Sequence, residues 1–460
     1  MNPAGETNKA TFTINLGGVA GRLAWGPNNP PGSFPTFSDL RFEVKFLKLD
    51  GTLVDTITRD GPATGVIQGD IDPGEYTVTL DIYFRDGGGI YLYANGSLVD
   101  DIGNPITHVT IVSGSNTVVH IKATQVIDDG SSTNPFKVYD ETTLQAVGSG
   151  GMPYGTNPWG RAHHYVLMKD VTLTVPWTPL CTGTSPFLGI FDGNGKTINL
   201  GSDKVTTNAS GGNFFYAGLF DAIYIGSMVK NLRLEGSIDV SSLGGGDYVN
   251  VGAVAAQANG GSIMNVYSNV NITAASGYLS YAGGIVGDNN GGNVLNCRNE
   301  GTITGNGPGR GVVGGIVGQN SGTVTFCWGD GNIIAPTVTN TDTGGIAGII
   351  RSSGGTLTNC VALNNTITGG FTSYTGRVFG RTQTTTIDFN FANDAMSGVT
   401  VTEDYQTGKD GEDANTTQAN NMTWWTTTAG WTSIQANKSA ASESNPWYWG
   451  AGNRPRLWFE

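Results

Sequence analysis

Apolar residues recur in the second half of the chain in a short glycine-rich pattern that returns about every thirty residues. Each copy sets at least two apolar residues beside one to three glycines, and the seven copies occupy residues 188–191, 217–220, 251–254, 283–287, 314–318, 344–348 and 376–380. Measured at the second residue of each copy, the steps are 29, 34, 32, 31, 30 and 32 residues. A fixed period of this length predicts one structural unit that stacks on copies of itself.

Two further apolar ladders keep the same period. One runs through Leu232, Val266, Cys297, Cys327, Cys360 and Phe391, and is preceded by Asn at 231, 265, 296, 359 and 390. The other runs through Ile238, Ile272, Ile303, Ile333 and Ile367. Three apolar positions per period, separated by Gly- and Asn-rich turns, predict one coil of a right-handed parallel β-helix. Parallel strands lie about 4.8 Å apart, so seven coils predict a rod of roughly 30–35 Å.

The residues before the repeats alternate between apolar and polar side chains, as β-strands do. The alternation is clear over residues 10–16 and 40–49, and Asp50-Gly51 then predicts a hairpin turn. The chain is therefore expected to be all-β, with a flexible tail at 1–9 and an immunoglobulin-like or prealbumin-like β-sandwich at 10–127. A linker is expected at 128–134, an N-terminal cap of the β-helix at 135–185, the β-helix at 186–415 and a Trp-rich C-terminal cap at 416–460. Asp140 is expected to N-cap a short helix over 141–147.

Composition narrows the classes of partner. Only 13% of residues are charged, the net charge is −13 and the pI is about 4.7. An acidic chain without basic runs argues against nucleic acid and against anionic membranes, and no apolar stretch is long enough to span a bilayer. Three of the four cysteines lie at one register of the repeat, so they are interpreted as core residues rather than as disulfide or zinc ligands.

The repeats resemble those of bacterial surface proteins that carry GLUG motifs. The hallmark is seen as Gly-Gly-Ile-Val-Gly at 283–287, then Asn296-Cys297, then Gly301-Thr302-Ile303. The segment from 134 to 195 follows the family's lead-in order, so the resemblance covers about residues 134–460. It implies a cell-surface or secreted bacterial protein, with a lipid anchor as one mode of attachment, whose leader peptide is absent from this sequence. It implies adhesion or binding and brings no catalytic residues with it.

One register of the repeat collects acidic and amide side chains. It holds Glu235, Asn269, Glu300, Asp330 and Asn364. Glu300 and Asp330 on adjacent coils would lie about 5 Å apart, which suits a retaining carboxylate pair or a cation site. The same residues are common in turns for conformational reasons alone, and both readings stay open. All four histidines lie outside the repeats, which excludes a Ser/His/Asp system there.

Two other groups are candidates for binding. Asp192 and Asn194 form part of a calcium-like loop, although the downstream Glu of such loops is missing. Calcium is thus the one cofactor that the sequence leaves open. Trp424, Trp425, Trp447 and Trp449 could stack on sugar rings or simply pack against the rod.

These features favour a non-catalytic protein for adhesion or binding at a bacterial cell surface, with the β-helix as a rigid stalk or binding face. Its partner would be a glycan or a protein of the host or extracellular matrix. The first alternative is a fibre subunit that self-associates end to end or by strand addition through residues 10–16. The second is a polysaccharide hydrolase or lyase that uses Glu300 and Asp330. The adhesin hypothesis predicts an exposed aromatic or acidic patch on one face of the rod or at its cap.

Overall fold

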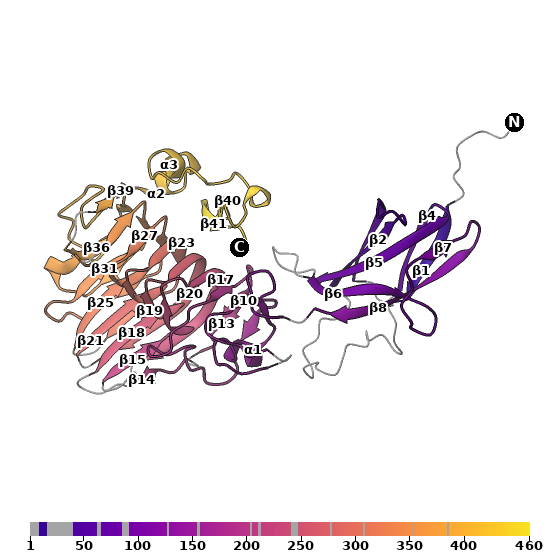
Figure 1. Ribbon diagram of the computed structural model, residues 1–460. Coiled ribbons are helices and arrows are strands. Elements are labelled where there is room, and N and C mark those ends of the chain that lie inside the picture. The colour runs from indigo at the N-terminus through magenta and orange to yellow at the C-terminus, as the bar shows by residue number, and fades with distance from the viewer. Residues whose placement is uncertain are drawn as a thin grey trace. The chain divides into compact units, whose positions relative to one another are not determined.

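The computed structural model describes residues 9–15, 40–61, 66–84, 92–126, 128–153, 157–202, 205–209, 213–240, 247–276, 278–306, 309–352, 354–383 and 386–460 (Figure 1). The chain divides into two units. One comprises residues 1–129 and 152–157, and the other comprises residues 130–151 and 158–460. The division after residue 129 falls within the predicted linker.

The first unit is a β-sandwich. Its strands are β1 (Ala10–Asn15), β2 (Leu40–Leu47), β3 (Leu53–Asp60), β4 (Val66–Ile71), β5 (Gly74–Phe84), β6 (Leu92–Val99), β7 (Val109–Ile111) and β8 (Asn116–Gln125). They pair in the order β3-β2-β5-β6-β8-β1-β4, and β7 pairs with β5. The sheet folds onto itself, because Phe12 of β1 packs on Phe46 of β2 with ring centroids 4.7 Å apart although the two strands are not neighbours. Alternating burial along β2 matches the alternation of its sequence.

β1, which covers most of residues 10–16, is not free to add to the sheet of another chain. β1 pairs in antiparallel fashion with β4 and in parallel with β8, so both of its edges are already hydrogen-bonded within the unit. Residue 16 lies outside the described residues. The strand that the sequence offered as a donor is thus an internal strand of its own sandwich.

The second unit is a parallel β-helix of about eight turns of about 31 residues. The first sheet contains β9 (Phe136–Val138), β10 (His164–Leu167), β11 (Val171–Thr172), β12 (Ile190–Asp192), β13 (Thr197–Asn199), β17 (Met228–Val240), β20 (Ser262–Ala275), β23 (Asn293–Asn299), β24 (Ile303–Asn306), β27 (Thr323–Thr325), β28 (Trp328–Gly329), β29 (Ile333–Ile334), β32 (Thr356–Thr358), β33 (Val361–Ala362), β34 (Ile367–Thr368), β37 (Ile387–Asp388), β38 (Phe391–Asn393) and β39 (Glu412–Ala414). In Figure 1 these strands lie side by side along the unit.

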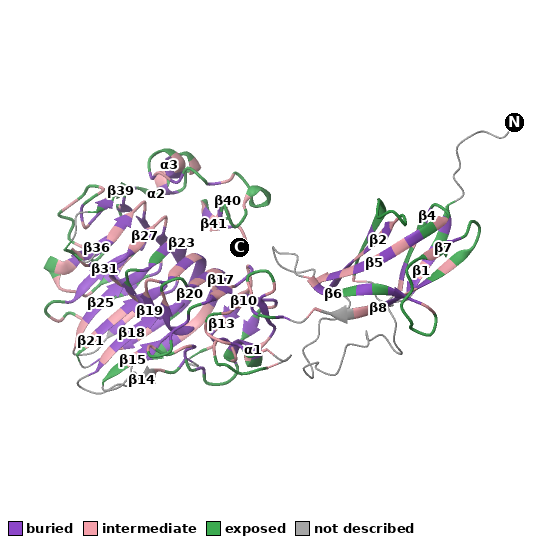
Figure 2. Ribbon diagram, viewed as in Figure 1, coloured by how far each residue is buried: buried purple, intermediate pink, exposed green. Residues whose placement is uncertain are grey.

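Two shorter sheets complete each coil. The second sheet contains β14 (Asn208–Ala209), β15 (Phe214–Ala217), β18 (Tyr248–Gly252), β21 (Leu279–Gly283), β25 (Arg310–Gly314), β30 (Asp342–Gly344) and β35 (Thr375–Gly376). The third sheet contains β16 (Phe220–Tyr224), β19 (Ala255–Asn259), β22 (Val286–Asn290), β26 (Val317–Asn320), β31 (Ala347–Ile350) and β36 (Phe379–Thr382). Buried and partly buried residues alternate along many of the strands in Figure 2, which places the core inside the coils.

The glycine-rich motif forms the corner between the second and third sheets rather than a strand. Ile285, Ile316 and Ile346 at this corner point into the core and are fully buried. The preceding glycines are required because stacked corners touch through their backbones. A Cβ on Gly284 would lie 2.2 Å from the carbonyl oxygen of Gly315, and one on Gly315 would lie 2.0 Å from that of Gly345.

The first of the seven copies does not belong to this corner. Ile190 in residues 188–191 pairs with His164 and Met228, so it lies on a strand of the first sheet. One coil before Gly218, Leu180 instead bridges to Phe220 at the start of the third sheet. Six copies therefore stack at the corner. The predicted number of seven was wrong because residues 188–191 resemble the motif but belong to a strand of the first sheet.

The other two ladders stack largely as expected. The isoleucine ladder from Ile238 to Ile367 is in register throughout. The Asn positions at 231, 265, 296 and 359 adopt a left-handed backbone with φ of 53–54°, which Asn tolerates better than most residues. The last coil differs by one residue from the prediction. Phe389 takes the left-handed position, and Phe391 pairs with Val361 rather than aligning with Cys360.

Coil stacking begins earlier than residue 186. β9 pairs with β10 and β10 with β12, so the region expected only to cap the rod supplies strands of the first sheet. The helix expected there is α1 (Glu141–Gln145), and Asp140 caps it by accepting a hydrogen bond from the Thr143 amide at 2.8 Å. It ends two residues before the predicted end.

At the other end, the degenerate copy of the motif marks the last coil. Arg377 stands where Gly345 stands one coil earlier. Its guanidinium donates to the carbonyl of Asp410 at 3.0 Å and to the carboxylates of Asp413 and Asp404 at 2.6 and 2.9 Å. The segment that holds these acceptors closes the end of the rod.

The Trp-rich segment 416–460 therefore covers a side of the rod, not its end. This strap contains α2 (Thr416–Ala419), α3 (Met422–Thr427), β40 (Trp447–Gly450) and β41 (Arg454–Leu457). Trp424 packs on Phe391 of the last coil, Trp431 donates to Asn359 at 2.9 Å, and Glu443 binds Lys230 at 2.6 Å several coils back. The strap thus runs back along the first sheet, as Figure 1 shows in yellow.

Candidate functional site

The four tryptophans proposed to bind sugars all lie in the strap. Trp424, Trp425 and Trp447 are 7%, 0% and 1% exposed, and they pack with Trp328 and Phe391 in one apolar cluster. Trp449 is partly buried against the same cluster. Three of the four rings thus have almost no face open to a sugar, and their contacts are those of residues that fasten the strap.

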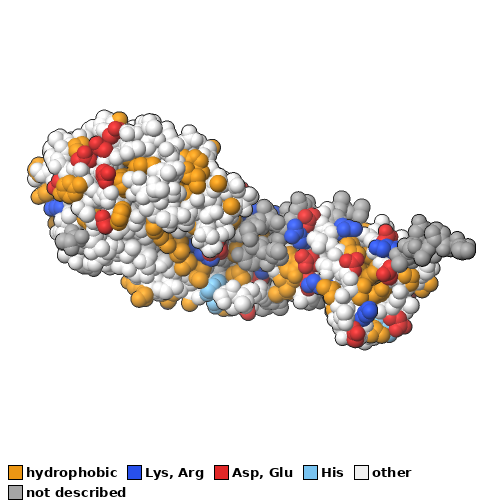
Figure 3. Space-filling view, turned by 90° about the horizontal axis from the view of Figure 1, so that it is seen from above, with side chains coloured by type: hydrophobic (Ala, Val, Ile, Leu, Met, Phe, Trp, Pro, Cys, Tyr) orange, Lys and Arg blue, Asp and Glu red, His pale blue; other side chains and the backbone are white. Residues whose placement is uncertain are grey.

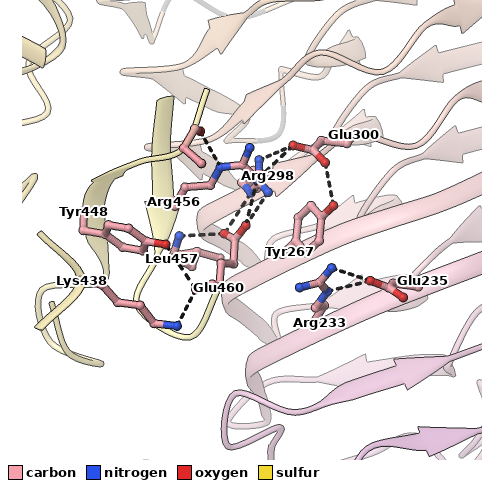
Figure 4. A network of polar contacts seen from close by, with 11 residues as sticks. Arg233, Glu235, Tyr267, Arg298, Glu300, Lys438, Tyr448, Arg456, Leu457 and Glu460 are labelled. Carbon is pink, nitrogen blue, oxygen red and sulfur yellow. Dashed lines mark hydrogen bonds and ion pairs between the residues drawn. The ribbon is translucent and has the colours of Figure 1, made fainter. Parts of the chain in front are cut away.

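Glu300 and Asp330 lie on adjacent coils where the strap crosses the rod. Arg298 donates to Glu300 at 2.6 Å, and the Tyr267 hydroxyl donates to its other oxygen at 2.6 Å. The guanidinium of Arg298 is fully buried between the rings of Tyr267 and Trp328, at 4.1 and 4.9 Å, and also binds the Glu460 carboxylate (Figure 4). Glu300 is therefore a member of an ion-pair network that joins strap and rod.

The environments of the two carboxyl groups differ. Burial opposes ionisation of Glu300, but Arg298 and Tyr267 outweigh it and lower its pKa. Burial and the neighbouring Glu300 raise the pKa of Asp330 to about 6. Two such pKa values would suit an acid and a base, yet Glu300 is already paired with Arg298, and Arg456 of the strap lies 3.5 Å from it. The arrangement favours a structural role.

The predicted calcium loop is also engaged by protein groups. One oxygen of Asp192 accepts from the Asn194 amide at 2.8 Å and from the Asn231 side chain at 3.1 Å. The other lies 3.1 Å from the Lys230 ammonium. A lysine at that distance competes with a cation for the carboxylate. No group of three or more His, Cys, Asp or Glu side chains among the described residues is arranged to hold a metal ion.

An exposed aromatic ladder that the sequence analysis missed lies on the second sheet. Phe214 stacks on Tyr248 with centroids 4.6 Å apart, and Tyr248 contacts Tyr278 at 4.8 Å. Phe214 and Tyr278 are 43% and 56% exposed. Phe214 and Tyr248 each stand four residues before the first corner glycine of their coil, and that spacing is the signal that was available.

The same register continues from the aromatic ladder into a group of basic residues. Phe214, Tyr248, Leu279 and Arg310 pair in succession along the second sheet. Arg310 binds the buried carboxylate of Asp342, which also pairs with Arg381 of the third sheet at 2.9 Å. The two sheets therefore meet at this corner through charged side chains.

A third arginine lies one coil away, and its hydrogen bonds within the described residues go to neutral groups. Arg351 donates to Gln319 at 2.7 Å and to the Tyr281 hydroxyl at 3.4 Å, and Gln319 donates to Asp288 at 2.9 Å. Arg310, Arg351 and Arg381, with their partners Asp342 and Asp288, form what we call the arginine corner. Burial raises the pKa of both Asp288 and Asp342, against the effect of the arginines.

Comparison with known proteins adds little. No family model matches the chain, and no curated protein matches it. Among solved structures the chain is similar to one named IgA1 protease, with 12% identity and a TM-score of 0.35, over 82% of this chain and 30% of that one. The chain thus spans less than a third of that protein's length, and so weak a likeness carries no argument about function. Within the described residues, no helix has the length and apolar character needed to cross a bilayer.

Proposed function

We propose that this is a non-catalytic binding protein of the bacterial cell surface, which acts in adhesion and uses the second sheet of its β-helix as the binding face. The observation that carries the proposal is the exposed aromatic ladder of Phe214, Tyr248 and Tyr278. Exposed rings that are lined up along a regular sheet offer apolar contact area at low cost in side-chain entropy. Charged side chains make up only 13% of the chain, and Figure 3 shows many uncharged side chains on the face of the second unit seen there.

The enzyme alternative is less well supported. A carboxylate pair must be free to meet a glycosidic bond. Glu300 instead accepts hydrogen bonds from Arg298 and Tyr267, and Arg456 of the strap lies 3.5 Å from its carboxylate. The β-helix is a rigid scaffold on which the aromatic ladder is placed by backbone register, and this favours recognition over turnover.

The test is a comparison of ligand binding by three forms of the full chain. The purified protein is screened against a glycan panel and immobilised extracellular-matrix proteins. The triple variant Phe214→Ala, Tyr248→Ala, Tyr278→Ala should lose binding, whereas Tyr405→Ala should retain it, because Tyr405 is a 53% exposed ring outside the ladder. Equal binding by the triple variant would refute the assignment of the face, and cleavage of a polysaccharide would refute the non-catalytic reading.

A further inference from the structure

We propose that the ligand of this face is an anionic polysaccharide that runs along the second sheet, with its sugar rings on the aromatic ladder and its anionic groups at the arginine corner. This inference rests on the proposed function and adds the chemical class of the ligand. The charged group is a carboxylate or a sulfate, since each presents two or more terminal oxygens that a guanidinium group can bind in pairs.

The charge of the corner supports an anionic ligand. Three arginines face two carboxyl groups, so the cluster has an excess of one positive charge even when Asp288 and Asp342 are both ionised. The whole chain carries −13 and has only 24 Lys and Arg residues. A local excess of positive charge on so acidic a protein would concentrate anions at this corner.

Arg351 is the member best placed to receive the ligand. Its only hydrogen bonds within the described residues go to the neutral Gln319 and Tyr281, and no carboxylate lies within ion-pair distance of it. Arg310 and Arg381 pair with Asp342, and each side chain is 26% exposed. Arg381 is held in place by the Tyr374 ring, 4.4 Å from its centroid. Arg351 can therefore bind an anion without giving up an ion pair.

The continuity of the face supports a chain ligand rather than a small anion. One register on four successive coils is occupied in turn by Phe214, Tyr248, Leu279 and Arg310. Successive coils are about 4.8 Å apart, so the ladder and the corner together span several coils along one line. A single carboxylate would need only the corner. An acidic protein segment would also carry charge, but it has no rings or planar faces repeating along its length to match the ladder.

The test measures the affinity of the full chain for four defined polymers: dextran, dextran sulfate, polygalacturonate and polyglutamate. The wild type should bind dextran sulfate or polygalacturonate at least tenfold more tightly than dextran or polyglutamate, and the difference should shrink with added salt. Which of the two binds identifies sulfate or carboxylate as the charged group. Arg351→Gln should weaken binding of the anionic polymer about tenfold or more, and Arg351→Lys should recover part of the loss.

Arg233→Gln is the matched control, because Arg233 lies on the first sheet beside Glu235 and should leave binding unchanged. Equal affinity for dextran and dextran sulfate, with no effect of Arg351→Gln but a loss in the triple aromatic variant, would overturn the anionic ligand and leave the binding face standing. Polyglutamate binding that depends on Arg351 would point instead to an acidic protein. If neither the Arg351 variants nor the triple aromatic variant loses binding, both proposals are wrong.

Discussion

The attachment of the strap to the rod can be tested at one buried ion pair. The Arg298 side chain is fully buried and that of Glu460 is 5% exposed. Glu460 also accepts from the Leu457 amide at 2.7 Å, which fixes the end of β41. Glu460→Gln keeps the shape of the side chain but removes its charge, so Arg298 keeps only Glu300 as an anionic partner.

Leaving a buried charge without its partner costs about 3–5 kcal/mol. Because Glu300 and its hydrogen bond at 2.6 Å remain, we expect Glu460→Gln to lower the free energy of unfolding of the strap by about 2–3 kcal/mol. Adding Arg298→Met removes the buried charge and keeps an apolar side chain between Tyr267 and Trp328. The second change should therefore recover part of the lost stability in the Glu460→Gln background, where Glu300 still has Tyr267 and Arg456 beside it, and the double-mutant cycle measures the coupling.

The assay is urea unfolding followed by tryptophan fluorescence, because six of the ten tryptophans lie in residues 416–460. Proteolysis of the strap under native conditions gives an independent readout. Glu443→Gln is the control, since Glu443 is half exposed where it pairs with Lys230 and should contribute less than about 1 kcal/mol. If Glu460→Gln is no more destabilising than Glu443→Gln, the buried pair does not hold the strap and the reasoning fails.

Three further results are expected. Gly315→Ala should lower the free energy of unfolding by about 1–3 kcal/mol, because its Cβ would lie 2.0 Å from a carbonyl oxygen. Gly329→Ala, where the nearest atom to the new Cβ is at 3.3 Å, should cost less, and equal costs in thermal denaturation would contradict the proposed role of the corner glycines. The folded state disfavours ionised Asp330, whose pKa is raised from 3.8 to about 6, so lowering the pH from 7.5 to 5 should raise the free energy of unfolding by about 1–2 kcal/mol. Asp330→Asn should abolish this gain, and equal pH dependence of stability in the wild type and the variant would refute the reasoning. Native protein at pH 8 should react with a thiol reagent only slowly, because Cys297, Cys327 and Cys360 are fully buried and burial raises the pKa of Cys181 to about 12; four rapid equivalents before unfolding would count against the packing.

Much of the fold follows from the sequence because stacking rewards identical residues at one register. The Ile238 ladder and the corner glycines are visible as a period, and a period needs no knowledge of distant contacts. The first copy of the motif and the last Asn position were wrong because a short pattern also occurs by chance beside a coil. In both cases the decisive fact is a strand pairing, of Ile190 with Met228 and of Phe391 with Val361.

The binding face was harder to see than the fold. Phe214 and Tyr248 lie outside the motif, four residues before its first glycine. The third ring, Tyr278, lies five residues before the first glycine of its coil, so the spacing is not constant. The arginine corner joins residues 310, 351 and 381, which no single period brings together, because they come from two sheets. The number of tryptophans in residues 416–460 suggested sugar binding. In the structure that number reflects the apolar area that the strap covers on the rod.

The strap also sets how long the rod can be. Its contacts fall on defined coils, from Trp424 on Phe391, through Trp431 on Asn359, to Glu443 on Lys230. Inserting one coil between residues 265 and 359 would increase the distance between the first and last anchor points by about 4.8 Å, and the strap would have to span that added distance to keep its contacts. A solenoid can usually gain repeats by duplication and lose them by deletion. Here the strap contacts several coils, so a change in coil number requires a matching change in the length of a segment distant in sequence.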